Sequence, residues 1–556
     1  MKKERIIQWL LLPCLLLTGV AFDSCKKDTD EAITAEFLDV KIHRFEMKHG
    51  LYYQLHHDER LIELEFSEAP EESTVEGNIS LEDKSGLLAD KYDLHVHHRK
   101  ILLVLKDDFR FRDGWKYVLT VGKGIQSKAG ISLQKDSIFQ LRTMAHHGAA
   151  EVLQNGQGDS VNRKYIAIIS DIHMGDERAI NNNYSWFSKN ADALSAFLDY
   201  VKDSNQVREL LILGDLFDEW MIPYSINPFD SSMNIQDSRE YFKAIAGNPT
   251  NAPIIDKFRE IALDNETKLV YVPGNHDMLN EKDIITEIIP NISWKGSSEG
   301  LGEYSPFSNM IFEHGHRYDF FNCPQPLVNT GHILPPGYFV SRMYAQGLME
   351  KDKTLQKDLW EYQGDFEFLA AWEIAFLYTF LHFGMLPPDM SAKNIRMGGV
   401  DNYTDAMSFH GARDMYAANI EDNWQATQTQ NEVPVHINCC LMAIWNGHSN
   451  LFGAAKIEYL DSSAPNQYNI VAFGHTHEPL IEVYPAGKYF SSIYANSGSW
   501  VNDEESSHEV RTFLMIKPAA WTGSELDVVS LLQFNRDLSA SGYRAELITE
   551  ESIEAK

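Results

Sequence analysis

The chain has 556 residues, of which 44% are hydrophobic, so it has the composition of a globular protein and the length for two or more domains. It carries 80 acidic and 49 basic residues, which gives a formal net charge of −31 at pH 7. So acidic a chain repels a phosphate backbone, which excludes nucleic acid as an expected partner.

The first 24 residues have the composition of a secretion signal. Lys2, Lys3 and Arg5 give a basic start, and residues 6–22 are almost entirely apolar. This apolar run is short for a bilayer span and contains Pro13. We therefore favour a cleaved signal over the alternative, an uncleaved membrane anchor.

Cys25 directly follows this segment, and the arrangement resembles a bacterial lipoprotein signal, in which such a cysteine becomes the lipidated first residue. Residues 25–36 would then form a tether. Its stretch Lys26–Glu31 resembles an acidic sorting tag of outer-membrane lipoproteins, and a plain solvated linker is the alternative. We expect an exported chain, held by lipid to the bacterial outer membrane on its periplasmic or cell-surface face.

The cysteine count argues against a disulfide framework. Cys14 leaves with the signal and Cys25 carries lipid, so Cys323, Cys439 and Cys440 remain. One bridge between Cys323 and either of the other two stays open. No Cys-x-x-Cys is present, so a thiolate zinc site is not expected.

Residues 37–144 have the alternating pattern of an all-β domain. In Leu61–Phe66 the apolar residues face one way and the two glutamates the other, as in a half-buried strand. Several such segments at short spacing predict a β-sandwich. The segments Ile62–Glu68, Ser73–Ile79 and Gly124–Gly130 resemble bacterial immunoglobulin-like modules of surface proteins, which imply a spacer or docking element.

The remainder of the chain follows a different pattern. Residues 145–163 are mostly small or polar and are interpreted as a linker. From Lys164 onward, apolar strands run into short polar motifs and then into helical segments, which indicates an α/β domain. We place it at 164–520, with a mostly helical, aromatic-rich insertion at about 320–465 and a C-terminal tail or strands at 521–556.

Five polar motifs each follow one of these apolar strands. In chain order they are Asp171-Ile172-His173, Gly214-Asp215, Gly274-Asn275-His276-Asp277, His314-Gly315-His316 and Gly474-His475-Thr476-His477. Asp-x-His and His-x-His place both side chains on one side, because strand direction repeats every two residues. Carboxylates and neutral imidazoles at the carboxyl edge of a sheet are donors that two adjacent divalent metals require.

This set of motifs, in this order, resembles the calcineurin-like metallophosphoesterases over about residues 164–515, apart from the insertion. The resemblance implies a four-layer α-β-β-α sandwich and two divalent metals (Mn, Fe or Zn), with a bridging hydroxide that attacks phosphorus. The implied metal ligands are Asp171, His173 and His477 for one metal, Asn275, His314 and His475 for the other, and Asp215 between them.

The resemblance also implies a catalytic pair. His276 would stabilise the phosphate or protonate the leaving oxygen, and Asp277 would orient His276 through a hydrogen bond. His316 and Arg317 are further candidates for touching substrate. The alternatives are a hydrogen bond to neighbours for His316 and a salt bridge to Asp319 for Arg317. Asp218 is interpreted as structural, either behind the ligands or as a helix N-cap.

Three segments resemble the UDP-diacylglucosamine hydrolase branch, whose members cleave a pyrophosphate in a lipid precursor beneath a helical lid: Leu213–Trp220, Gly474–His477 and Asn496–Trp500. The apolar segment Phe366–Leu386 is interpreted as such a lid or, alternatively, as a buried core helix. Asn496–Trp500 is expected to close the sheet near the metals.

The function that we predict is therefore an exported two-metal hydrolase of phosphomonoesters or phosphodiesters, with a phosphate ester and the membrane as its partners. One alternative is a membrane-docked phosphodiesterase that resembles a UDP-sugar-lipid pyrophosphatase. Another is a catalytically silent surface binding protein. The complete ligand set together with His276 argues against the silent protein, because a silent chain has no chemical need for it.

Overall fold

The structure, a computed structural model, describes residues 37–48, 51–144, 163–296, 302–319, 451–501, 510–537 and 542–555. The described ranges leave out positions 183, 224, 225, 227, 229, 265, 278, 279, 462 and 465. The structure also describes Asn322 and positions 337, 338, 341, 342, 345, 348 and 349. The predicted signal, Cys25, the tether, most of the linker and of the insertion, and Cys323, Cys439 and Cys440 lie outside the described residues.

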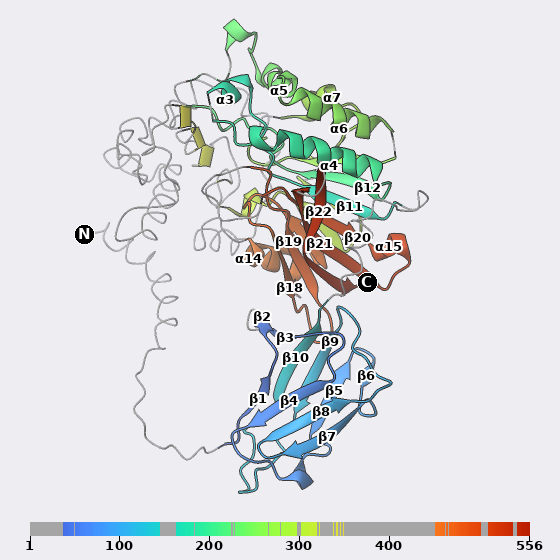
Figure 1. Cartoon of the computed structure of the whole chain (residues 1–556). Helices are drawn as coiled ribbons and strands as arrows, with labels where there is room; N and C mark the ends of the chain where they lie inside the picture. Colours follow the sequence, from blue (N-terminus) through green and yellow to red (C-terminus); the bar gives the residue numbers. More distant parts are fainter. Residues whose placement is uncertain are drawn as a thin grey trace, which may run out of the picture.

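The N-terminal domain consists of two β-sheets that pack face to face (Figure 1). Strands β4 (Leu61–Phe66) and β8 (Lys100–Leu105) alternate buried and half-exposed residues, as the sequence predicts for strands with one face in a core. The prediction of an all-β sandwich is thus confirmed. The four-stranded sheet has the order β1 (Val40–His43), β4 (Leu61–Phe66), β8 (Lys100–Leu105), β7 (Tyr92–His97). The six-stranded sheet has the order β2 (Met47–Lys48), β3 (Tyr52–Leu55), β10 (Ser137–Thr143), β9 (Lys116–Val121), β5 (Ile79–Asp83), β6 (Gly86–Leu87).

The second domain contains two further sheets. The seven-stranded sheet has the order β14 (Ser293–Trp294), β13 (Lys268–Val272), β12 (Val207–Leu213), β11 (Tyr165–Ile169), β20 (Thr512–Lys517), β21 (Leu526–Asp537), β22 (Gly542–Glu554). The five-stranded sheet has the order β15 (Glu303–Tyr304), β16 (Met310–Glu313), β17 (Ile470–Phe473), β19 (Ser492–Asn496), β18 (Leu480–Tyr484). The C-terminal residues, expected as a tail or strands, form β21 and β22, which extend the first of these sheets in antiparallel fashion.

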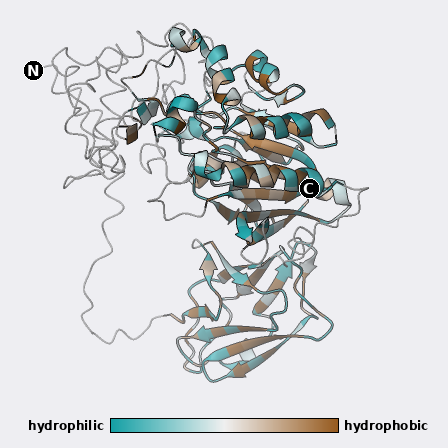
Figure 2. Cartoon of the chain, turned by 45° about the horizontal axis from the view of Figure 1, so that its top comes forward, coloured by the Kyte–Doolittle hydropathy of each residue, from teal (hydrophilic) through white to brown (hydrophobic). Residues whose placement is uncertain are grey.

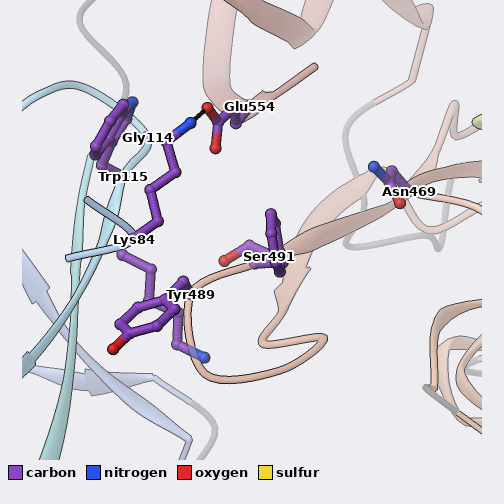
Figure 3. Close-up of a pocket in the computed structure, with 9 residues that line it drawn as sticks. Lys84, Gly114, Trp115, Asn469, Tyr489, Ser491 and Glu554 are labelled. Carbon is purple, nitrogen blue, oxygen red and sulfur yellow. Dashed lines mark ion pairs between the residues drawn. The ribbon is translucent and has the colours of Figure 1, made fainter. Parts of the chain in front are cut away.

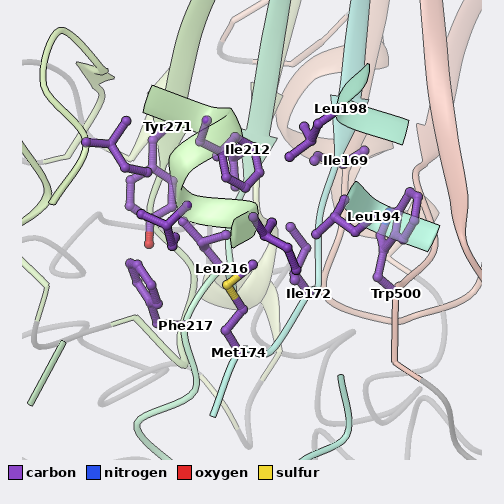
Figure 4. Close-up of a cluster of buried hydrophobic side chains, with 14 of the residues drawn as sticks. Ile169, Ile172, Met174, Leu194, Leu198, Ile212, Leu216, Phe217, Tyr271 and Trp500 are labelled. Atoms are coloured by element: carbon purple, nitrogen blue, oxygen red, sulfur yellow. The ribbon is translucent and has the colours of Figure 1, made fainter. Parts of the chain in front are cut away.

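Alternation along the strands divides this domain into layers. In β11, Ile166 and Ile168 face the core between the two sheets, whereas Ala167 and Ile169 face the helices. Figure 4 shows Leu194 and Leu198 of one helix beside Ile169 and Ile212 of the strands. The helices that pack on this outer face are α4 (Ala191–Asp203), α5 (Ser238–Gly247), α6 (Ala252–Asp264) and α7 (Lys282–Ile288).

The other sheet is covered by α14 (Phe452–Ala455) and η6 (Lys456–Leu460), so the four-layer α-β-β-α arrangement is confirmed. In Figure 2 the helices carry hydrophilic and hydrophobic residues, while the strands beneath them are mostly hydrophobic. Short elements complete the described ranges: η1 (Glu72–Thr74), α3 (Glu177–Asn181), η2 (Ser188–Asn190), η3 (Ser231–Met233), η4 (His316–Tyr318) and α15 (Ala519–Thr522). No helix among the described residues combines the length and the apolar character that a bilayer crossing requires.

The two domains are joined by a buried interface. Arg142 of β10 is 1% exposed, and its Nη1 lies 2.6 Å from Glu551 Oε2 of β22. Its Nη2 donates to the Ser552 carbonyl at 2.6 Å. Gly114 lies against the same strand, where a Cβ atom would stand 2.5 Å from Ser552 O. The side chain of Tyr52 joins the core between the two sheets of the second domain. The N-terminal domain, called the module below, is therefore packed into the second domain.

A crevice beside this interface shows which end of the second domain the module covers. It is lined by Lys84, Gly114, Trp115 and Lys116 from the module and by Asn469, Tyr489, Phe490, Ser491 and Glu554 from the second domain (Figure 3). Lys84 pairs with Glu554, and the buried Lys116 donates to the Gly487 carbonyl. Burial lowers the pKa of Lys116 to about 8. Asn469 directly precedes β17, so the module covers the amino end of this strand, away from the motif Gly474–His477.

The chain enters the module at its other end. Leu38 pairs with Leu133, which precedes β10, whereas Arg142 near the close of β10 contacts the second domain. The length of β10 therefore lies between Leu38 and this contact.

Arg142→Met should lower the free energy of unfolding by about 3–5 kcal/mol, because it leaves the Glu551 carboxylate buried without its cation. The measurement is urea unfolding of residues 26–556. Lys202→Met is the matched control, since Lys202 and Glu260 form an exposed pair that contributes at most about 1 kcal/mol. Equal effects of the two substitutions would contradict the role given to the interface.

Candidate metal centre

The five polar motifs meet at one edge of the two catalytic sheets. Each follows the carboxyl end of a parallel strand, namely β11, β12, β13, β16 and β17. Ligands collect at this edge in α/β folds. All seven predicted metal ligands are described, and all but the half-buried His477 are buried.

Asp171, His173 and His477 form the first cluster. His477 Nε2 lies 3.2 Å from Asp171 Oδ1 and 3.2 Å from His173 Nε2. One donor atom from each of the three side chains falls within 4.8 Å of the others, a spacing that suits a metal ion. The structure thus brings together the three residues predicted for one metal.

Asp215, His314 and His475 form the second cluster by the same criterion. His314 Nε2 lies 3.1 Å from Asp215 Oδ2 and 3.1 Å from Asn275 Oδ1. Asp215 Oδ2 is also 3.6 Å from His173 Nε2 of the first cluster. Asp215 therefore lies between the clusters, where a bridging carboxylate is needed.

The glycines beside these ligands lie so close to the donor side chains that a Cβ atom would not fit. A Cβ atom on Gly214 would overlap the His314 ring, and one on Gly274 would overlap Asp215 Oδ1. A Cβ atom on Gly474 would stand 2.6 Å from Asp171 Oδ2. Glycine is required at these positions because any larger residue displaces a donor.

Backbone strain is concentrated at the same residues. Positive φ angles, which non-glycine residues rarely adopt, occur at Asp171 (51°), His173 (55°), Asp215 (53°), His475 (70°) and His477 (60°). Each such residue costs about 1–3 kcal/mol and persists only where the surroundings enforce it. The strained backbone at these residues lowers the stability of the fold but directs the donors toward one another, which is typical of a functional site.

Electrostatics explain how two carboxylates share this space. Burial alone would raise the pKa of Asp171 and of Asp215, but the charge of His314 and of other imidazoles outweighs burial and holds both pKa values low. Burial would lower the pKa of His314, but Asp215 and Asp171 raise it to about 9. Buried carboxylates in contact need positive charge between them, which divalent cations supply as well as imidazolium does. The donor set therefore fits metal ions.

Each of two ligand histidines has one ring nitrogen occupied and the other directed into the site. His314 Nδ1 donates to the Leu213 carbonyl at 2.8 Å, and His173 Nδ1 lies 3.2 Å from Asp218 Oδ2. Nε2 is then the nitrogen free to ligate, as is usual for metal-binding histidines held by a carbonyl or carboxylate.

The orienting partner of His276 is Asp218, and the role predicted for Asp277 is wrong. His276 Nδ1 lies 2.7 Å from Asp218 Oδ1. The Asp277 carboxylate instead accepts backbone N–H groups of Leu216, Phe217 and Gly274. The Asp277 carboxylate faces the loop after β12 because the side chains of adjacent residues, here His276 and Asp277, point in different directions. Burial together with the charge of Asp215 raises the pKa of Asp277 to about 7. Asp218, interpreted from sequence as structural, holds both His173 and His276.

The two further substrate candidates differ. His316 is buried beside the second cluster, with its ring centroid 5.5 Å from that of His314 and 6.3 Å from that of His475. Arg317 pairs through Nε with Glu313 at 2.7 Å, and its guanidinium donates to Tyr459. The carboxylate partner of Arg317 thus lies on β16, and the alternative of a salt bridge to Asp319 is wrong. Contact of Arg317 with substrate stays a prediction.

Asn496–Trp500 closes the sheet behind the site, as expected. Asn496 Nδ2 donates to the Gly474 carbonyl, and Ser497 Oγ lies 2.7 Å from Ser170 Oγ. Trp500 is fully buried in the helix-facing core. These contacts fix the loops that carry Asp171 and His475.

An apolar wall stands beside the first cluster. The ring centroid of Trp186 lies 5.5 Å from that of His173, and Trp186 packs against Ala179, Tyr184, Met221, Ala345, Leu348 and Met349. Sequence reasoning did not single out Trp186, since a lone tryptophan in a loop carries no motif.

Comparison with known proteins agrees with this geometry. The family model of calcineurin-like phosphoesterases matches residues 164–479, over half of the chain. The chain therefore belongs to the calcineurin-like phosphoesterase family, and its second domain is that of a metal-dependent phosphoesterase. No match was found among curated proteins.

Similar solved structures include phosphopantetheinyl hydrolase (PptH) from Mycobacterium tuberculosis, with 11% identity over 61% of this chain and 91% of that one, and a TM-score of 0.21. CopC from Methylosinus trichosporium OB3b matches 17% of this chain and 85% of its own, at 17% identity and a TM-score of 0.14. The N-terminal part of the bacterial S-layer protein SbsC matches 17% of this chain and 24% of its own, at 16% identity and a TM-score of 0.13.

Gly274→Ala should weaken metal binding by about tenfold or more, the scale seen when groups that hold ligands are disturbed. The added methyl would overlap Asp215 Oδ1 and stand 2.6 Å from Asp215 N. Metal content after dialysis against buffered Mn²⁺ or Zn²⁺ measures the effect. Gly247→Ala, where a Cβ atom meets nothing within 4 Å, is the control and should retain metal. Full metal content in Gly274→Ala would refute the packing argument.

Asp218→Asn should lower kcat by about tenfold or more, because it weakens general acid catalysis, which typically contributes about 10²- to 10⁴-fold to the rate. Burial lowers the pKa of His276, but Asp218 and Asp215 raise it more, so it lies above its ordinary value. Removing the Asp218 charge lowers that pKa, and His276 then loses its proton at lower pH. The alkaline limb of kcat/KM should therefore move to lower pH, measured at saturating metal. Asp527→Asn, a buried carboxylate at the amino end of the sheets, should leave the profile unchanged. An unmoved limb in Asp218→Asn would argue against His276 as the acid.

Proposed function

We propose that this chain is an exported hydrolase of phosphomonoesters or phosphodiesters that uses two divalent metals. The observation that carries the proposal is the pair of donor clusters that share Asp215: Asp171, His173 and His477 on one side, and Asn275, His314 and His475 on the other. Mn, Fe or Zn suits these oxygen and nitrogen donors. When bound, such a pair of metals supplies Lewis acidity that activates water and stabilises charge on the phosphoryl oxygens.

The protein's own contribution is the placement of a proton donor. Asp218 engages His276 Nδ1, so Nε2 is the nitrogen that can reach a phosphoryl or leaving-group oxygen. Trp220 packs against the His276 ring at a centroid distance of 4.7 Å and limits its rotation. Asp218 also favours the protonated ring, which suits a group that donates a proton to the departing alcohol.

The test uses residues 26–556, stripped of metal by a chelator and reloaded with Mn²⁺, Zn²⁺ or Mg²⁺. Turnover of p-nitrophenyl phosphate or bis-p-nitrophenyl phosphate should return with metal and be lost in Asp215→Ala, and the preferred ester separates a monoesterase from a diesterase. Asp527→Asn serves as the control. Folded protein that turns over neither ester with any metal would contradict the proposal and favour a silent binding protein or an enzyme whose lipid substrate needs its membrane.

A membrane-docked lipid phosphodiesterase is the second candidate, and the apolar wall beside His173 favours it. Trp186, Met221, Leu348 and Met349 offer hydrocarbon contact next to the first cluster. Phospholipid or lipid pyrophosphate in vesicles, added to the same assay, distinguishes the candidates. Hydrolysis confined to vesicles would select the second, whereas equal rates with soluble esters would select the first.

The proposed location rests on sequence: a basic start, an apolar segment and Cys25. If Cys25 carries lipid, cells expressing the chain should hold it in the outer-membrane fraction, and Cys25→Ser should release it to the soluble fraction. Cys323→Ser is the control for loss of a thiol and should remain with the membrane. Retention of Cys25→Ser in the outer-membrane fraction would contradict the proposed lipid anchor.

A further inference from the structure

Two buried residues beside the second cluster belong to none of the five motifs. Asp319 and Asn322 follow η4, and their exposed fractions are 0% and 8%. The Asn322 backbone N–H donates to the Asp319 carbonyl at 3.1 Å, and Asn322 Nδ2 donates to Asp319 Oδ2 at 2.6 Å. This arrangement directs one carboxylate and one amide toward metal ligands from other strands.

The first contact is with His475. Asp319 Oδ2 lies 2.9 Å from His475 Nε2. In His173 and His314 it is Nδ1 that is occupied, by Asp218 and by the Leu213 carbonyl, and Nε2 that faces the cluster. His475 has the reverse arrangement: the carboxylate takes Nε2, and Nδ1 is the nitrogen left for a metal. A carboxylate on the outer nitrogen fixes the tautomer and makes the ligating nitrogen more basic.

The second contact is with Asn275. Only the oxygen of an amide ligates a metal well, so the amide must not turn over. Asn275 Nδ2 donates to Asn322 Oδ1 at 3.4 Å, and Asn275 Oδ1 then points to His314 Nε2 at 3.1 Å. Asn322 thereby selects the orientation that presents oxygen to the cluster.

We propose that Asp319 and Asn322 are positioning residues of the second metal site, with Asp319 acting through His475 and Asn322 acting through Asn275. The inference rests on the two-metal function proposed above. It adds a specific asymmetry, because the first site has no contact with Asp319 or Asn322 among its described bonds. Loss of either side chain should therefore weaken the binding of one metal and leave the other unchanged.

The test is metal titration of the apoprotein, residues 26–556, with Mn²⁺ or Zn²⁺ in chelator buffers, with metal content read by elemental analysis. Wild type should bind two ions. Asp319→Asn should weaken one of the two by about 10- to 100-fold, the effect typical of such outer partners. The control is Asp527→Asn, which changes another buried carboxylate that accepts from an asparagine amide, and it should bind both ions normally.

A His475→Ala background shows whether Asp319 acts through that ring. There, adding Asp319→Asn should change the affinity of the weakened site less than twofold. Circular dichroism of the metal-free proteins checks folding, and if Asp319→Asn is unfolded, Asn322→Ser, expected to weaken the same site, replaces it. Wild-type affinity at both sites in Asp319→Asn, or an undiminished effect in the His475→Ala background, would overturn the inference. A wild-type chain that binds fewer than two ions would instead refute the two-metal function.

Discussion

Two buried carboxylates, Asp171 and Asp215, govern the arrangement of the whole catalytic end of the molecule. A buried anion is costly unless hydrogen-bond donors and positive charge surround it. The backbone N–H of His475 donates to Asp171, that of His276 donates to Asp215, and imidazoles fill the space between them. The glycines beside the ligands follow from the same need, because a side chain at those positions would separate the carboxylates from their partners.

The gathering of the candidate donors could be predicted from sequence because each motif pairs a donor type with a position directly after a strand. Such information is local, and it is sufficient here because parallel strands end at a common edge, which brings donors from distant motifs together. The partners of those ligands could not be predicted. Asp218 and His276 are separated by 58 residues, and Asp319 and His475 by 156. Nothing in sequence spacing pairs residues so far apart, and this is why the sequence points to Asp277, the immediate neighbour of His276, instead of Asp218.

The fold shows the same division between local and distant information. Alternation in Leu61–Phe66 and continuous apolar character in Tyr165–Ile169 are local, and they predicted a one-sided and a doubly covered strand correctly. The attachment of β21 and β22 to β20 depends on pairing between complete strands, and residues 521–556 therefore could be given only as a tail or strands. Arg142 and Glu551, which form a buried pair, are 409 residues apart. The sequence around either residue gives no sign of this pairing.

The packing of the N-terminal domain against the amino ends of the strands has a consequence for the candidate site. Asn469, which lines the crevice between the domains, directly precedes β17, whereas the motif Gly474–His477 follows the other end of the same strand. Every clustered donor among the described residues belongs to the second domain. The N-terminal domain therefore acts on the candidate site only through the stability of the strands that it packs against, and it contributes no side chain to the chemistry of the described donors.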